Sequence, residues 1–166
     1  MTDKTSNGPP GTIELKIPAS SEWVRVARLT VAATASRLNF GFDDIEDIKL
    51  AVAEAINNAI QHAPIPKGGE APPQVTIRVG VVGDGLQITI SDEGHLTHAL
   101  NVLDSKPRRG DDNLPDGGLG LLLIRSLMDE VSHVSGPNSN TTLSMVKHLP
   151  PRYTGGHPLG APAPRR

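Results

Sequence analysis

The sequence predicts an α+β fold, a two-layer sandwich in which helices lie on one face of a mixed, mostly antiparallel sheet. Residues 12–18 and 74–92 alternate apolar and polar side chains, as strands with one buried face do. Residues 20–40 and 43–63 carry apolar side chains at helical spacing. Helices grouped on one face of such a sheet bury both apolar surfaces against each other.

The first half of the chain supplies one strand, over residues 12–18, and two helices. Ser20 is placed to cap a helix over 20–40. Asp43 or Asp44 can cap the second helix, over 43–63. The buried stripe expected on this second helix comprises Ile45, Ile48, Val52, Ala55, Ile56 and Ala59.

The second half supplies two hairpins and a third helix. Residues 74–92 form a hairpin that turns at the letters GDG. The side chains expected on its buried side are Val75, Ile77 and Val79. Residues 93–117 are polar and too long for an ordinary connection, which indicates a functional loop or lid. A helix over about 118–130 and a closing hairpin over 131–135 and 141–149 follow.

Composition excludes several classes of protein. The length of 166 residues suggests one domain, over 12–149, between Pro- and Gly-rich tails (1–11 and 150–166) that are expected to be disordered. The chain has no cysteine, so it has neither disulfides nor a thiolate metal site. A net charge of -2 and few aromatic side chains argue against a nucleic-acid partner. The longest apolar run is too short for a membrane span, and the N-terminus lacks a signal peptide, which favours a cytoplasmic protein.

Polar residues follow the apolar stripe of the helix over 43–63. Glu54 and Asn58 share one face because four residues separate them. An Asn oxygen suits Mg²⁺ together with phosphate oxygens and water, and a Glu one turn away can accept a proton from a hydroxyl. The alternative for this strip, taken alone, is a solvated helix edge. His62 extends the strip and is assigned no role.

The stretch ITISDEGHL ends an apolar strand in Asp92, which Gly94 follows. A carboxylate at this position can accept a hydrogen bond from the exocyclic amine of a base, and glycine lets the backbone approach a ligand. An ordinary turn between a strand and a loop is the alternative, because Asp and Gly are common in turns.

The stretch DGGLGLLLIRSLMDEV (116–131) places Gly117, Gly118 and Gly120 at the start of a helix. Backbone N–H groups and the helix dipole make such a position an anion site. A helix cap with close helix packing would explain one glycine but hardly three. The stretch is not a Walker A loop, because no Gly-Lys-Ser/Thr follows it.

In this order, EAINNAIQHA, SDEGHLTHA and DGGLG resemble the N, G1 and G2 boxes of the Bergerat-fold ATPases, the histidine-kinase-like group. The resemblance covers residues 12–149. The longer stretches IKLAVAEAINNAIQHA and GGLGLLLIRSLMDEV narrow it to the anti-sigma-factor serine kinases of bacterial partner-switching systems. The LMDEV ending and the short stand-alone domain are the specific signals.

The resemblance implies a role for each matching residue. Glu54 would be the general base that activates a substrate serine, and Asn58 would bind Mg²⁺ beside the nucleotide. Asp92 would bind the adenine amino group with Gly94 beside it, and residues 95–117 would form the lid over ATP. The remaining nucleotide contacts would come from Gly118, Leu119, Gly120 and Thr141.

Two positions depart from the family pattern. Leu96 stands where the G1 box usually ends in glycine, and this change affects the geometry expected for the lid. Asn140 replaces the glycine that usually precedes the threonine, and asparagine can also adopt a left-handed backbone. Neither change removes a catalytic group.

The function that the resemblance implies is that of an ATP-dependent serine kinase and anti-sigma factor. Such a protein sequesters a sigma factor and phosphorylates a STAS-type anti-anti-sigma protein on serine, with ATP and Mg²⁺. A homodimer is expected, formed through apolar surface on the open sheet face and the helix over 20–40. Two alternatives stay open: a non-catalytic ATP-binding module, and a nucleotide-independent interaction domain.

Overall fold

The computed structural model describes residues 11–66, 71–92, 118–136 and 139–150. Its strands are β1 (Ile13–Pro18), β2 (Gln74–Val82), β3 (Gly85–Asp92), β4 (Glu130–Gly136) and β5 (Ser139–His148). Its helices are the 3-10 turn η1 (Ser21–Trp23), α1 (Val24–Ala35), α2 (Phe42–Gln61) and α3 (Gly118–Leu127). Apart from Gly11 and Pro150, the two predicted tails lie outside the described residues, as does the predicted lid.

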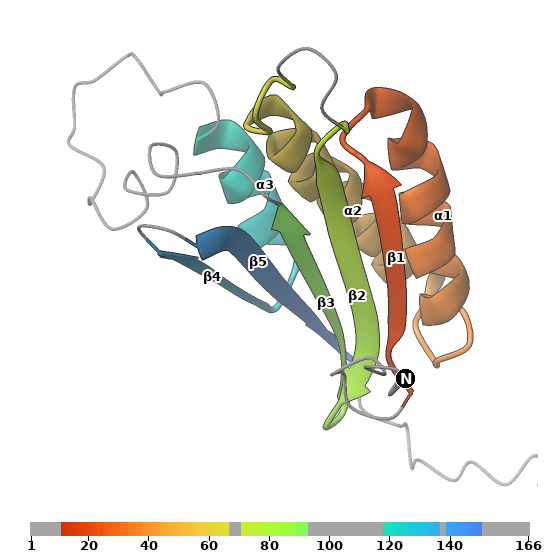
Figure 1. Cartoon of the computed structure of the whole chain (residues 1–166). Helices are drawn as coiled ribbons and strands as arrows, with labels where there is room; N and C mark the ends of the chain where they lie inside the picture. Colours follow the sequence, from red (N-terminus) through yellow and green to blue (C-terminus); the bar gives the residue numbers. More distant parts are fainter. Residues whose placement is uncertain (1–10, 67–70, 93–117, 137–138, 151–166) are drawn as a thin grey trace, which may run out of the picture.

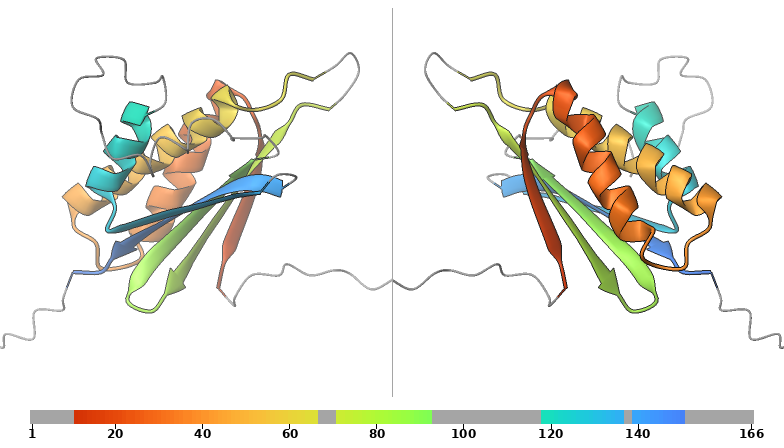
Figure 2. Two further views of the ribbon diagram at one scale, coloured as in Figure 1. Left: turned by 90° about the vertical axis from the view of Figure 1, so that its left-hand side faces the viewer. Right: turned by 90° about the vertical axis from the view of Figure 1, so that its right-hand side faces the viewer.

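The elements form two layers (Figure 1). One layer is a five-stranded sheet with the strand order β1-β2-β3-β5-β4. The helices α1, α2 and α3 form the other layer, and in the described part of the chain they all lie on one face of the sheet (Figure 2). The predicted α+β sandwich is therefore confirmed.

All four pairs of neighbouring strands are antiparallel. The sequence predicted a mixed sheet, and among the described strands this detail is wrong. Two of the pairs are hairpins, which are antiparallel by necessity, and β1 and β5 run opposite to the strands beside which they lie. The turn of the first hairpin consists of Gly83 and Asp84, between paired Val82 and Gly85. Gly83 has a φ of 60°, a backbone conformation that favours glycine.

The core lies between the helices and the inner face of the sheet. In the strand register Val79 pairs with Ile88, and Ile88 pairs with Met145, so buried side chains form continuous rows across the sheet. Each such fully buried side chain contributes about 1.5–3 kcal/mol. The buried residues of α2 are Ile48, Ala51, Val52, Ala55, Ile56 and Ala59. The predicted stripe is confirmed except for Ile45, which is only partly buried.

The outer face of the sheet is mostly polar. Nε of Arg78 lies 2.7 Å from Oε2 of Glu14, and this hydrogen bond lowers the pKa of the Glu14 carboxyl. Further along the sheet, Gln87 donates to Ser144 over 3.2 Å. This described face therefore offers little apolar surface to the second copy that the sequence predicts, and the dimer stays a prediction. Because successive side chains of a strand point to opposite faces, the apolar side chains of these strands lie on the face that the helices cover.

The helix predicted over 20–40 is shorter than expected. It begins with η1, and α1 ends at Ala35. Ser20 occupies the cap position, but its side chain makes no capping hydrogen bond. After Ala35 the chain turns more tightly, because the N–H of Leu38 donates to Ala35 rather than to a residue four positions earlier.

The helix predicted over 43–63 begins one residue early, at Phe42. Oδ2 of Asp44 accepts the backbone N–H of Gly41 over 3.2 Å. Asp44 therefore caps the helix from its third position, as the carboxylate of a capping box does.

One histidine connects three segments of the sheet. Nε2 of His148 lies 3.0 Å from Oε1 of Glu130, and Nδ1 lies 3.1 Å from Oδ1 of Asp84. These hydrogen bonds raise the pKa of His148 above its usual value of 6.5. Because the folded state binds the proton more tightly, the stabilisation is complete below pH 6.5 and is lost as the pH rises through the raised pKa.

We therefore expect His148→Gln to lower the unfolding temperature in mildly acidic buffer and to have progressively less effect at higher pH. Thermal denaturation across a pH series measures the difference from wild type. His133→Gln, the same substitution in β4, serves as the control. A difference that does not change with pH would contradict this assignment.

Within the described ranges, none of the helices combines the length and the apolar character that a membrane span needs.

Candidate functional site

The start of α3 lies against the polar strip of α2. A Cβ added to Gly120 would clash with Oε1 of Glu54, and it would lie 3.0 Å from Cδ of Glu54 and 3.1 Å from Nδ2 of Asn58. Both side chains are half-buried, whereas Asn57 between them is exposed. The two residues predicted on α2 and the glycine predicted on α3 therefore meet at one place.

This contact gives Gly120 a packing role, which was the alternative considered for the glycine-rich stretch. Any larger residue would displace the Glu54 carboxylate from its position beside α3. Gly118 and Leu119 form the first turn of the same helix, and Leu119 is 68% exposed. The first N–H groups of a helix have no partner within the helix and attract anions. Close packing and anion binding are therefore compatible at this position.

A second pair of predicted residues lies on neighbouring strands. Asp92, the last residue of β3, is the register partner of Thr141 in β5. In the described part of the chain they are the buried polar residues, with exposed fractions of 4% and 3%. Asp92 follows the alternation of Ile88 and Ile90, so it shares the inner face of the sheet.

A buried carboxylate is costly to desolvate, and such groups are concentrated at functional sites. Here the carboxylate and a threonine stand side by side under the helical layer. Figure 1 shows the end of β3, the first turn of α3 and the C-terminal half of α2 directed toward the same end of the molecule. The elements that carry the two pairs of residues therefore have these ends on the same side of the molecule.

The structure leaves some of the predicted residues undescribed. Gly94, Leu96 and the lid over 95–117 lie outside the described residues. Asn140 lies within β5, and no residue other than glycine has a positive φ among those described.

The donor set fits the magnesium ion that a nucleotide would bring. Asn58 carries one neutral amide oxygen, and its amide group lies beside the helix start, with Nδ2 3.1 Å from the position of a Cβ on Gly120. Mg²⁺ keeps several waters and is commonly held by few protein ligands together with substrate phosphates. One amide oxygen from Asn58 would satisfy that requirement.

Comparison with known proteins agrees with the geometry. The family model of the histidine kinase-like ATPase domain matches residues 17–147. Serine-protein kinase RsbW of Bacillus velezensis is 42% identical over 141 residues, which cover 82% of this chain and 85% of the relative. The RsbW kinase of Bacillus subtilis is 42% identical over 142 residues, with the same shares covered.

A solved structure supports the fold. The crystal structure of the RsbU and RsbW domains of Rv1364c from Mycobacterium tuberculosis matches with a TM-score of 0.58 and 17% identity. The match covers 85% of this chain and 32% of that chain. The chain thus belongs to the histidine kinase-like ATPase domain family and, within it, to the family of the RsbW serine-protein kinases.

Proposed function

We propose that this chain is an ATP-dependent serine kinase and an anti-sigma factor. It sequesters a sigma factor and phosphorylates a STAS-type anti-anti-sigma protein on serine. The observation that carries the proposal is the meeting of Glu54, Asn58 and Gly120 where α2 and α3 touch. The relatives named serine-protein kinases support it at 42% identity.

In this proposal, the buried residues Asp92 and Thr141 on the sheet recognise adenine. The Asp92 carboxylate accepts a hydrogen bond from the exocyclic amine of the base, and Thr141 lies beside it as its register partner. A hydrogen bond to a charged group contributes about 1.5–3 kcal/mol, more than one between neutral groups. A buried carboxylate therefore selects adenine over a base that has a carbonyl at the same position.

In this proposal, the first turn of α3 and Asn58 bind the phosphates. The free N–H groups of Gly118, Leu119 and Gly120 face the phosphates, and the helix dipole favours their negative charge. Asn58 would hold Mg²⁺, and the ion would supply charge neutralisation at the phosphates. Catalysis of phosphoryl transfer depends mostly on such positioning and charge neutralisation.

Glu54 activates the substrate serine, whose hydroxyl oxygen accepts the phosphoryl group. Its carboxylate lies beside the start of α3, where the phosphates are proposed to bind. It accepts the proton of the substrate serine hydroxyl while the serine oxygen bonds to the γ-phosphorus of ATP and the bond from that phosphorus to the ADP oxygen breaks. The side chain is half-buried, so it is partly shielded from water and remains reachable by a docked protein.

Binding of Mg²⁺-ATP to the wild type and to Asn58→Ala, measured by calorimetry, tests the nucleotide site. We expect the wild type to bind and the variant to lose about tenfold or more in affinity, because a charge-assisted contact is removed. Asn57→Ala is the matched control, since this neighbouring amide is exposed. A folded wild type that does not bind ATP would refute the kinase proposal.

The oligomeric state and the location of the protein are part of the same proposal. The homodimer stays a prediction, and its interface is sought on α1 rather than on the polar sheet face. Val26 and Leu29 of α1 are 46% and 47% exposed, and Trp23 before them is 38% exposed. Light scattering at micromolar concentration measures the oligomeric state, and a monomer would contradict the dimer. A cytoplasmic location and the absence of membrane and nucleic-acid partners are proposed on the composition.

A further inference from the structure

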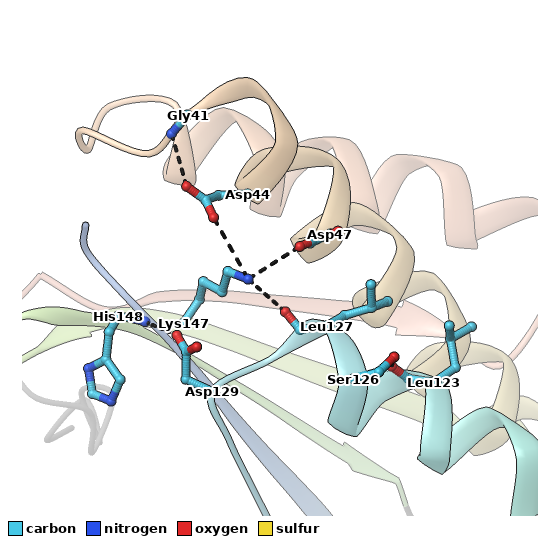
Figure 3. Close-up of polar contacts among 9 residues, drawn as sticks. All are labelled: Gly41, Asp44, Asp47, Leu123, Ser126, Leu127, Asp129, Lys147 and His148. Atoms are coloured by element: carbon cyan, nitrogen blue, oxygen red, sulfur yellow. Dashed lines mark hydrogen bonds and ion pairs between the residues drawn. The ribbon is translucent and has the colours of Figure 1, made fainter.

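The C-terminal end of α3 is anchored to α2 and β5 by one lysine (Figure 3). Nζ of Lys147 donates to the carbonyl oxygen of Leu127 over 2.8 Å. The same nitrogen lies 3.3 Å from Oδ2 of Asp47 and 3.8 Å from Oδ1 of Asp44. The Lys147 side chain is only 13% exposed. The lysine on β5 therefore connects the last residue of α3 to the first turns of α2.

The residues after α3 extend this anchor. The backbone N–H of Asp129 donates to the carbonyl oxygen of Val146 over 3.0 Å. Oδ2 of Asp129 in turn accepts the backbone N–H of His148 over 2.6 Å. Leu127 and Asp129 belong to the LMDEV stretch, which the sequence singled out without a role. This stretch fixes the exit of α3 to β5.

The chemistry of the anchor suits its position. The last carbonyl groups of a helix have no partner within the helix, and a cation is favourable there because of the helix dipole. Lys147 satisfies one such carbonyl and pairs with two carboxylates of α2 at the same time. The lysine is largely buried, whereas the side chains of Asp44 and Asp47 are 33% and 39% exposed. The anchor therefore restrains α3 relative to α2.

The opposite end of α3 is held just as closely. Gly120, near the start of the helix, lies so close to Glu54 and Asn58 that an added Cβ would clash with the Glu54 carboxylate unless that side chain moved. The ten residues of α3 span about 15 Å. A small rotation of the helix about its anchored end therefore moves its first turn by a distance that matters for catalysis. Misplacement of reacting groups by about 1 Å can cost about 100-fold in rate.

We propose that Lys147 is a positioning residue for the nucleotide site at the other end of α3. By fixing the C-terminal end of that helix to α2 and β5, Lys147 sets how closely the first turn of α3 approaches Glu54 and Asn58. The effect on nucleotide binding rests on the proposed kinase function. The effect on the approach of α3 to α2 does not.

Lys147→Met tests the inference, because methionine keeps an unbranched apolar stem and removes the charge and the hydrogen bonds. We expect ATP affinity, measured by calorimetry, to fall about tenfold or more in this variant. Lys147→Arg, which can pair with the carboxylates and donate to the carbonyl, is expected to restore affinity to within about threefold of wild type.

Val79→Ala is the control for loss of stability. Val79 is 2% exposed and lies on β2, two strands away from β5. Its truncation lowers the unfolding temperature without touching the anchor. We expect this control to keep ATP affinity within about threefold of wild type at temperatures well below unfolding, because its nucleotide site is intact.

Hydrogen exchange of the nucleotide-free protein gives a readout independent of ATP. Backbone amides of residues 121–124 are expected to exchange faster in Lys147→Met than in Val79→Ala when both are compared at equal stability. If the wild type fails to bind ATP, the kinase proposal fails, and this exchange measurement still decides the role of Lys147. Equal exchange in the two variants would overturn the inference.

Equal loss of affinity in Lys147→Met and Val79→Ala, or no loss in Lys147→Met, would also overturn it. If Lys147→Met does not fold, Asp47→Asn replaces it, since that variant removes one carboxylate and leaves the carbonyl contact of Lys147 in place. Like Lys147→Met, Asp47→Asn is then expected to weaken ATP binding and to speed hydrogen exchange in α3. Unchanged ATP affinity and unchanged exchange in Asp47→Asn would refute the inference.

Discussion

Glu54→Gln is expected to slow phosphoryl transfer to the substrate serine by about 10²–10⁴-fold. Glutamine has the same shape and fits beside Gly120, but its amide cannot accept the serine proton. Because the lost interaction is made in the transition state, kcat and kcat/KM should fall together while affinity for ATP changes little. Transfer of labelled phosphate to the cognate antagonist measures the rate, and calorimetry measures ATP binding.

Glu46→Gln is the matched control, since it makes the same change on the same helix. Glu46 is exposed and pairs with Nζ of Lys49 over 2.7 Å. We expect this variant to transfer phosphate at the wild-type rate. A normal rate in Glu54→Gln would remove Glu54 from catalysis. Intact control of the sigma factor without any transfer would favour the non-catalytic ATP-binding module instead.

Gly120→Ala tests the same carboxylate from the opposite helix. The new Cβ would clash with Oε1 of Glu54, which is the end of a flexible side chain and can move aside. We expect the fold to survive and the transfer rate to fall about 100-fold, because the base is displaced. Gly41→Ala, where the nearest atom to the new Cβ lies 3.5 Å away, controls for the gain of a methyl group.

Asp92→Asn is expected to weaken ATP binding by about 10- to 100-fold, the loss of one hydrogen bond to a charged group. The amide either presents an NH₂ group to the adenine amine or offers a neutral oxygen in place of a charged one. Asparagine keeps the shape of aspartate and one acceptor oxygen, so the unfolding temperature of the nucleotide-free protein should change little.

This combination of effects separates a ligand-binding carboxylate from a structural one. Calorimetry gives the affinity and thermal denaturation gives the stability of the nucleotide-free variant. Asp43→Asn makes the same substitution at an exposed position in the first turn of α2 and should leave ATP binding unchanged. A large fall in stability with unchanged ATP affinity would show that Asp92 serves the fold rather than the nucleotide.

The sequence by itself determined most of the side chains that α2 and β2 bury, and it supplied the candidate residues for the site. Alternation placed Val75, Ile77 and Val79 on the inner face, and the structure confirms all three as buried. The four-residue spacing put Glu54 and Asn58 on one face of a helix. These are local properties, because the periods of helix and strand fix where side chains point within one element.

Tertiary structure decided how the elements meet. Only the pairing of β3 with β5 brings Asp92 beside Thr141, although the two are far apart in the chain. Only the docking of α3 on α2 shows that a side chain on Gly120 would displace the Glu54 carboxylate. The anchor at Lys147 likewise joins β5 to both helices. No local period encodes such contacts, because strand order and helix docking depend on how all the apolar faces pack together.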